Sequence, residues 1–320
     1  MNRRLRRLVQ RETNDNVCGA VEDDDRVTVF VQRKLKPATI QRYIRDPNKP
    51  EWTPRDFLPE RLRTGLLTEK EVDVVEVGHV KALLTDRGQY RPVKGGVEIS
   101  IVNWPFVGTA GMPVRFTRFG GWALVGGLKS FAALLARLGH VGEQRTGLLT
   151  NSHVANRSVL SPKHESITQP GYANSPIIGR TVYSAPVNKD GDNRFDASVV
   201  EVDDDVVVDD EIHSIGRVLG VRYARVGEDV FKRGRTTRLL EGVCTHRRVS
   251  MRIDFGPDGI IWFSNLDMFT NISQGGDSGS AIIAQDDNHA VSLLFAGDGG
   301  QYSFGIPMPE VFKDTGIELP

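Results

Sequence analysis

From about residue 112 onward, the sequence is a succession of short β-type segments separated by turn residues. About eleven such segments fit into roughly 195 residues, a density typical of an antiparallel sandwich or a pair of barrels. Helical segments do not alternate with them, which argues against a parallel α/β sheet. We therefore expect a mainly β, antiparallel fold whose strands include MPVRFTRF, TGLLTNS, DASVVEV, GVCTHRRVSM, SAIIAQ and AVSLLFAG.

The region before residue 112 has a different pattern. RVTVFVQ at 26–32 and EVDVVEV at 71–77 are rich in β-branched residues, and a proline-spotted stretch separates them. These features predict two strands in a small mixed α/β module. We expect an N-terminal extension at 1–111 and a second domain at 112–320. The strands of the extension are too few to be stable alone, so the extension should pack against the second domain.

Two helices and one connector are expected within the second domain. An insertion near 126–145 predicts a helix whose apolar face carries Leu128, Phe131, Leu135 and Leu138. The last segment begins with prolines and predicts a closing helix at 307–318. The acidic run at 201–211 lacks the glycine that a calcium loop uses, and we interpret it as a solvated connector.

The charge balance indicates no polyanionic partner. Lysine and arginine together number 41, as do aspartate and glutamate, so the formal net charge is zero. The basic start has no apolar stretch typical of a secretory signal, and no run of about 18 apolar residues could span a membrane. The two cysteines, Cys18 and Cys244, lie far apart, which favours a reducing compartment. We predict a cytoplasmic protein with no nucleic-acid partner.

The stretch NISQGGDSGSAII at 271–283 gathers small residues around the hydroxyl of Ser278. A surface turn would explain part of this composition, and a nucleophile that needs backbone N–H groups beside it would explain all of it. A serine hydroxyl is a poor nucleophile until a base takes its proton. The base is normally a histidine that a buried carboxylate orients. Ser278 therefore predicts one partner histidine and one partner acid.

His153 and Asp196 are the candidates for these partners. Of the seven histidines, only His153 directly follows an apolar strand end, in GLLTNSHVANRS. Asp196 stands at the head of the apolar run in NRFDASVVEV, and Asp192 nearby is the alternative acid. The order histidine, aspartate, serine excludes the α/β-hydrolase arrangement, in which the nucleophile comes first, and is that of the chymotrypsin type.

TNSHVA, FDASVVEV and GGDSGSAII together resemble the chymotrypsin-like, or trypsin-like, serine proteases. FKRGRTTRLLEGV is similar to the strand–turn–strand that precedes the nucleophile in bacterial members of that superfamily. VTVFVQRKL, EVDVVEVG and LLTNSHVA resemble, in that order, the intracellular subgroup that includes the plant narrow-leaf proteins and bacterial relatives. The resemblance covers most of the chain, roughly 26–315.

The resemblance implies an antiparallel double β-barrel of chymotrypsin type, with a small N-terminal α/β extension and a C-terminal helix. Barrel one would lie at about 112–205 and barrel two at about 213–306, with the site in the cleft between them. In that site, Ser278 would attack the scissile carbonyl, His153 would relay the proton, and Asp196 would fix the imidazole tautomer. The function implied is a serine endopeptidase that hydrolyses protein or peptide substrates through an acyl-enzyme, with no metal or organic cofactor.

The resemblance also implies which residues surround the nucleophile. The N–H groups of Gly276 and Ser278 would form the oxyanion hole. Ile272 would lie at the base of the primary pocket. The backbone of the opposite wall would pair with substrate as an added strand, and it is formed by Phe295, Ala296 and Gly297. An isoleucine offers no charge to a buried lysine or arginine, so we expect cleavage after uncharged, small to medium apolar residues.

Two departures from the family keep alternatives open. Digestive relatives are activated by cleavage at an IVGG-like site, and the new N-terminus pairs with the acid beside the serine; no such stretch occurs here. Asp277 must therefore have another partner, or the enzyme is regulated otherwise. The alternative function is a double-barrel protein-binding module that is catalytically silent or activated by a partner. A regulatory partner and a homo-oligomer both remain open.

Overall fold

Two large β-sheets form most of the fold. The computed structural model describes residue 7 and residues 17–31, 71–76, 87–119, 122–123, 142–172 and 174–320. The 8-stranded sheet has the order β6 (Val107–Ala110), β5 (Val97–Ile101), β10 (Ser166–Thr168), β11 (Ile177–Ser184), β12 (Ser198–Val202), β9 (Glu143–Thr150), β7 (Met112–Phe119) and β8 (Trp122–Ala123). Its pairings are antiparallel.

The first sheet closes on itself at Gly111. β6 pairs with β5 and continues through Gly111 into β7, which pairs with β9. The Gly111 N–H donates to the carbonyl of Leu149 at 2.7 Å. The two half-strands therefore close one barrel. A Cβ at Gly111 would lie 2.2 Å from the carbonyl oxygen of Gly279, so only glycine lets this corner approach the turn that carries Ser278.

The second sheet contains a closed ring and an extension. This 10-stranded sheet has the order β16 (Asp229–Gly234), β19 (Ala281–Ala284), β20 (His289–Gly297), β21 (Tyr302–Pro307), β18 (Ile260–Thr270), β17 (Arg238–Asp254), β1 (Val17–Glu22), β2 (Arg26–Val31) and β3 (Glu71–Glu76). Its tenth strand, β15 (Gly220–Val221), pairs with β20 off this path. Because β16 also pairs with β17, the strands from β16 to β17 close into the second barrel.

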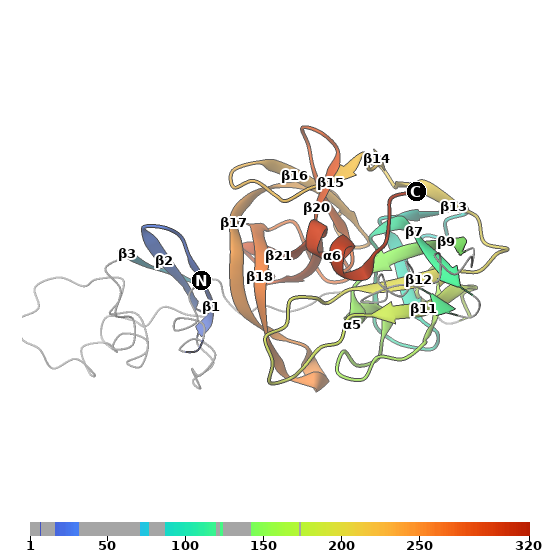
Figure 1. Ribbon diagram of the computed structural model, residues 1–320, viewed down its shortest axis with the longest axis horizontal. Coiled ribbons are helices and arrows are strands. Elements are labelled where there is room, and N and C mark those ends of the chain that lie inside the picture. The colour runs from blue at the N-terminus through green and yellow to red at the C-terminus, as the bar shows by residue number, and fades with distance from the viewer. Residues whose placement is uncertain are drawn as a thin grey trace, which may run out of the picture.

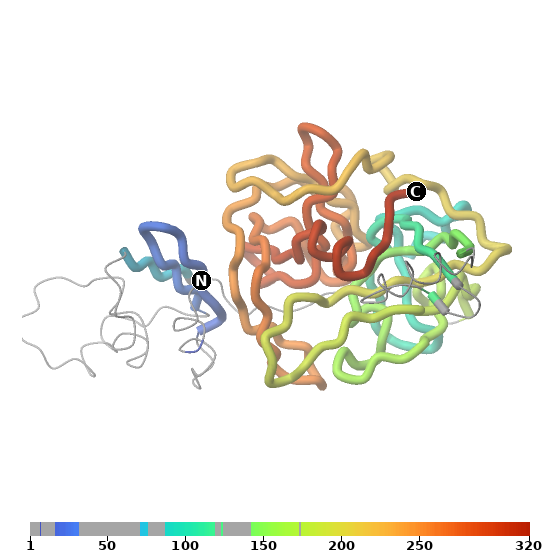
Figure 2. Tube along the Cα trace, in the orientation of Figure 1, coloured from blue at the N-terminus to red at the C-terminus, as the bar shows by residue number. Residues whose placement is uncertain are grey.

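The N-terminal strands join the second barrel through the backbone. β1 pairs antiparallel with β17, with Gly19 opposite Met251 and Ala20 opposite Ser250. A Cβ at Gly19 would lie 1.9 Å from the carbonyl oxygen of Ser250, so the strands approach closely there. Figures 1 and 2 show the extension on the side of the second barrel that faces away from the first.

Short elements complete the architecture. A 3-stranded sheet orders β14 (Gly216–Arg217), β13 (Val208–Ile212) and β4 (Val93–Gly95). Within residues 87–320, as far as the structure describes them, the helical elements are α5 (Ser152–Ala155), the 3₁₀ turn η2 (Gly256–Asp258) and α6 (Met308–Thr315), which packs on the second barrel (Figure 1). One buried apolar cluster contains residues of both barrels, among them Phe116, Leu149, Phe263 and Phe304.

The predicted fold class, a mainly β antiparallel double barrel with a C-terminal helix, is confirmed by these two rings and α6. The expected boundary at residue 112 falls inside the first barrel, because β5 and β6 already belong to it.

The acidic run at 201–211 contains the start of β13, where Asp209 pairs with Lys94 at 2.8 Å. The insertion helix near 126–145 lies mostly outside the described residues, as does the basic start. No described helix is long and apolar enough to cross a membrane.

Asp267 is a fully buried carboxylate within the second barrel. Its Oδ2 accepts a hydrogen bond from Ser292 Oγ at 2.6 Å, and its Oδ1 lies 3.2 Å from Arg247 Nε. Burial raises the pKa of Asp267 from 3.8 to about 6, although both partners oppose that rise. The folded protein therefore binds a proton here more readily than the unfolded chain does. The contribution of Asp267 to the free energy of unfolding should therefore fall as the pH rises from about 4 to about 6.

Asp267→Asn should remove this component of the pH dependence. The difference in unfolding free energy, wild type minus variant, should decrease by about 2 kcal/mol between pH 4 and pH 7, since one pKa unit corresponds to about 1.4 kcal/mol and the effect is complete only below pH 4. Urea unfolding across that range measures it. Asp287→Asn is the control, because pairing with Arg222 lowers the pKa of Asp287 to about 2, below this window. A difference that stays constant for Asp267→Asn would contradict the prediction.

Candidate active site

His153 and Asp196 form a hydrogen-bonded pair in the first barrel. β9 ends at Thr150 and the short helix α5 follows, which places His153 one turn beyond the strand. Asp196 is fully buried just before β12. Its Oδ2 lies 2.5 Å from His153 Nδ1, and its Oδ1 accepts the His153 backbone N–H at 3.0 Å. A carboxylate can only accept, so Nδ1 carries the proton and Nε2 is left as the basic nitrogen.

Asn151 fixes the loop that carries this aspartate. Its side-chain amide donates to the Asp196 backbone carbonyl at 2.7 Å. The pair is therefore held through both the backbone and the side chain of Asp196. The sequence prediction that His153 and Asp196 come together agrees with this geometry, and Asp192 makes no described contact with His153.

Ser278 and His153 line the same cleft, which has a volume of about 350 Å³. The cleft wall is mainly apolar and includes Trp104, Phe106, Val159, Ile253, Phe255 and Phe295. The Phe255 ring packs edge-on to the imidazole of His153, with 5.7 Å between centroids. The hairpin that carries Phe255 reaches the first barrel, where Asp258 accepts hydrogen bonds from Ser158 Oγ and Val159 N, each at 2.8 Å.

The hydroxyl of Ser278 points toward a backbone carbonyl. Its Oγ donates to the carbonyl of Phe295 at 3.3 Å, and no hydrogen bond joins it to His153 in the described part of the chain. The side chain is 7% exposed, so the cleft reaches it. A rotation of this hydroxyl toward His153 is needed before the imidazole can take its proton. Such contacts commonly tighten only when substrate is bound.

Two N–H groups beside Ser278 are free to bind an anion. Among the hydrogen bonds of the described residues, neither the Gly276 N–H nor the Ser278 N–H donates to a protein atom. Gly276 has φ +96°, a conformation that favours glycine. The two groups predicted to form an oxyanion hole are thus available in the turn that carries the serine.

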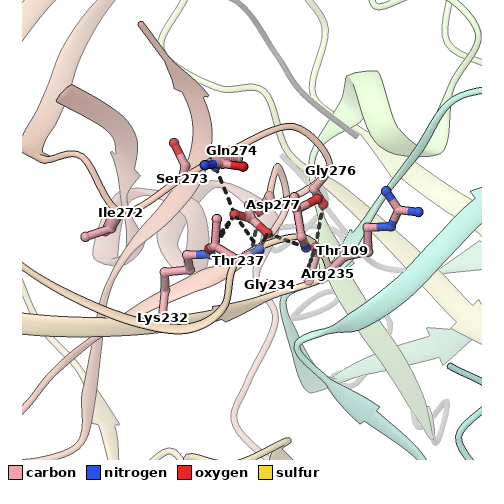
Figure 3. A network of polar contacts seen from close by, with 12 residues as sticks. Thr109, Lys232, Gly234, Arg235, Thr237, Ile272, Ser273, Gln274, Gly276 and Asp277 are labelled. Carbon is pink, nitrogen blue, oxygen red and sulfur yellow. Dashed lines mark hydrogen bonds and ion pairs between the residues drawn. The ribbon is translucent and has the colours of Figure 1, made fainter. Parts of the chain in front are cut away.

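Lys232 is the partner that Asp277 requires. Both side chains are fully buried, and Lys232 Nζ lies 2.7 Å from Asp277 Oδ2 (Figure 3). Burial lowers the pKa of Lys232, and the charge of Asp277 opposes that shift. The carboxylate also accepts the N–H groups of Thr236 at 2.7 Å and Gln274 at 3.0 Å, and the Thr237 hydroxyl at 2.7 Å. The turn is therefore built around a satisfied buried charge.

The position of Lys232 in its strand predicts that the residue is buried, although no motif indicates it. In the β16 strand DVFKRG, Lys232 shares the inward face with Val230, two residues before it. A lysine on an inward strand face needs a buried acid. A second buried pair was also missed: Arg235 Nε lies 3.0 Å from Glu98 Oε2 and joins the two barrels.

The residues predicted to form the primary pocket lie in closely packed surroundings. Ile272 is fully buried in the core cluster of the second barrel and is not among the residues that line the cleft. A Cβ at Gly297 would lie 2.7 Å from Ser273 Oγ, which is itself 2.8 Å from Ser303 Oγ. Asp298 Oδ1 accepts the N–H groups of Gly300, Gln301 and Tyr302 at 2.8–2.9 Å, as a turn residue does.

The end of β20 has an open side. Pairing of β20 with β19 ends at Leu293, whereas pairing with β21 continues to Gly297. Within the described residues, Phe295, Ala296 and Gly297 therefore have a strand neighbour on one side only. Among the same residues, no group of three or more His, Cys, Asp or Glu is arranged to hold a metal ion.

Comparisons with known proteins find only distant similarity. No protein-family model matches the sequence, and no curated protein matches it. Among solved structures, Thermobifida fusca Protease A is similar at 19% identity over 71% of this chain and 97% of its own, with a TM-score of 0.49. Cellulomonas bogoriensis chymotrypsin has 21% identity over 71% and 98% (TM-score 0.48), and Nocardiopsis protease has 17% over 71% and 98% (TM-score 0.49).

Lys232→Met should strongly destabilise the protein, because it leaves the Asp277 carboxylate buried without a counter-charge. Breaking a buried pair in this way costs about 3–5 kcal/mol. Urea unfolding near neutral pH measures the loss. Lys232→Arg is the matched control, since it keeps the charge, and it should lose less. Equal stability of Lys232→Met and the wild type would show that the pair does not hold the turn.

Proposed function

We propose that this protein is a serine endopeptidase that hydrolyses peptide bonds through an acyl-enzyme intermediate. The observation that carries the proposal is the placing of the His153–Asp196 pair and Ser278 on one cleft, beside two undonated N–H groups. No other set of residues in the described cleft combines a base, an orienting acid and a hydroxyl. The chemistry follows from these three groups and from the turn that carries the serine.

The steps begin with the rotation of the Ser278 hydroxyl from the Phe295 carbonyl toward His153. His153 Nε2 takes the proton as the oxygen attacks the substrate carbonyl, and Asp196 stabilises the imidazolium that forms. The N–H groups of Gly276 and Ser278 bind the oxyanion, an effect worth about 3 kcal/mol per donor. The imidazolium then protonates the leaving amine, and a water repeats the sequence to release the acid product.

The open side of β20 supports an extended substrate. A peptide that lies beside residues 295–297 would pair with them as a further strand, and its side chains would alternate between the cleft and solvent. The apolar wall around Phe255 and Phe295 favours uncharged residues near the scissile bond. We therefore propose proteins or peptides as substrates. A cytoplasmic location stays a proposal, and the two buried free cysteines support it.

A partner-activated or silent binding module is the second candidate. The observation that favours it is the Ser278 hydroxyl, which is held by Phe295 and not by His153. If a partner had to turn this hydroxyl, the isolated protein would not react with an active-site reagent. The two candidates therefore give opposite results in one labelling experiment.

A fluorophosphonate probe should label the isolated wild-type protein, because it reacts only with an activated serine. Ser278→Ala should abolish labelling and keep the melting temperature, since it removes one hydroxyl from a cleft. Ser280→Ala is the control from the same turn: its hydroxyl donates to the Asp277 carbonyl at 2.6 Å, so labelling should persist. Labelling that survives Ser278→Ala would disprove the nucleophile. No labelling of the wild type would favour the silent or partner-activated module.

A peptide library should show cleavage after uncharged, small to medium apolar residues. The wall of the cleft is mainly apolar, and Asp298 is committed to three N–H groups of its own loop. Asp298→Ala should leave this preference unchanged, and mass spectrometry of the products measures it. Dominant cleavage after lysine or arginine, lost in Asp298→Ala, would show that the acid faces the pocket.

A further inference from the structure

The orientation of the Gly275–Gly276 peptide unit depends on contacts with neighbouring groups. An oxyanion hole requires the Gly276 N–H to face the cleft, and this N–H shares a planar peptide unit with the Gly275 carbonyl. The two groups point in opposite directions, so a half-turn of the unit would put the carbonyl where the oxyanion should bind. Consecutive glycines resist such a turn least, because neither residue has a Cβ.

Thr236 holds one side of this peptide unit. Its hydroxyl donates to the carbonyl of Gly275. The Thr236 backbone is itself fixed, because its N–H donates to Asp277 Oδ1 at 2.7 Å. The Gly275 carbonyl is thereby drawn toward β16 and the following turn, and the Gly276 N–H is directed the other way.

Thr109 holds the next peptide unit from the first barrel. Its Oγ1 accepts the Arg235 N–H at 3.1 Å, so the single hydroxyl proton is available for the Gly276 carbonyl at 2.7 Å (Figure 3). The Thr109 N–H also donates to the Ser278 carbonyl at 2.8 Å. Thr109 is fully buried, so water does not compete for these bonds.

We propose that the hydroxyls of Thr236 and Thr109 are positioning groups that keep the oxyanion hole formed. Neither threonine is among the residues that line the cleft. They act through the carbonyls of Gly275 and Gly276. The anion that the hole binds is the tetrahedral oxyanion of acyl transfer, so the inference rests on the proposed peptidase function. The hole is assembled from both barrels, because Thr109 lies in β6 and Thr236 follows β16.

Thr236→Val removes the hydroxyl at nearly constant shape, and Thr236→Ser keeps it. Loss of a whole oxyanion donor costs about 10²–10³ in kcat, so loss of its positioning should lower kcat by about 10- to 100-fold. KM should stay within about twofold of the wild-type value. A peptide boronic acid, which forms the tetrahedral anion, should lose affinity in parallel with kcat/KM. Thr236→Ser should restore kcat to within about threefold.

Thr109→Val and Thr109→Ser form a second pair of variants, which serves as the test if either Thr236 variant fails to fold. In this pair too, kcat should fall for the valine variant while KM stays nearly constant. An unchanged kcat in the valine variants would overturn the inference. So would a serine variant that loses as much activity as the valine variant, because the hydroxyl would then not be the active feature.

A crystal structure of Thr236→Val separates this inference from the proposed function. A Gly275 carbonyl that turns into the cleft, or occupies two orientations, supports the positioning role. An unchanged carbonyl overturns it, whatever the activity. Failure of the wild type to react with a fluorophosphonate would instead count against the peptidase, while the orientation of the peptide would still decide the role of Thr236.

Discussion

The charge of Asp277 is buried without access to water, and the turn that carries Ser278 takes its shape from satisfying that charge. Lys232 supplies the opposite charge, and hydrogen bonds come from the N–H of Gln274 in the same turn and from the N–H of Thr236 in the turn after β16. A buried carboxylate tolerates little displacement, since each lost partner leaves a costly unsatisfied atom. The buried charge therefore determines the backbone conformation of the turn. The positions of Ser278 and of the two free N–H groups depend on that conformation.

The two barrels meet on this same turn. Gly111 of the first barrel touches the Gly279 carbonyl so closely that no side chain fits at that corner, and Thr109 bonds to the carbonyls of Gly276 and Ser278. The buried Arg235–Glu98 pair crosses the same interface. His153 and Ser278 come from different barrels, so their separation is set where the barrels touch. Other contacts between the barrels lie away from this turn, among them the shared apolar cluster and the hydrogen bonds from Ser158 and Val159 to Asp258.

The sequence predicted what depends on local pattern and could not predict what depends on distant contact. Alternating β-type segments predicted the class of fold, and the small residues around Ser278, with His153 and Asp196 after and before their strands, predicted the pairing seen between the histidine and the acid. The sequence did not show that the first barrel begins before residue 112. The reason is that β5 and β6 are short and are separated by turn-like residues, so they do not stand out as strands of the barrel. Thr109 and Thr236 showed no signal, since a hydroxyl that bonds to a carbonyl 167 or 39 residues away leaves no mark on its own neighbours. The pocket residue Ile272 was assigned by resemblance alone, and its burial in the core is set by packing around it.

The strands added before the barrels change the outer border of the second sheet. β1 covers part of β17, and β2 and β3 carry the sheet outward, so that β3 is its last strand among the described residues. That strand is short and bears Glu71 and Asp73 on alternate positions, both bridged to Arg26 of its neighbour. Unpaired strand borders invite other chains to add on, and short borders rich in charge discourage it. Among the described residues, the added strands thus end the second sheet in a short strand that carries two carboxylates, the kind of border that discourages a further strand from pairing there.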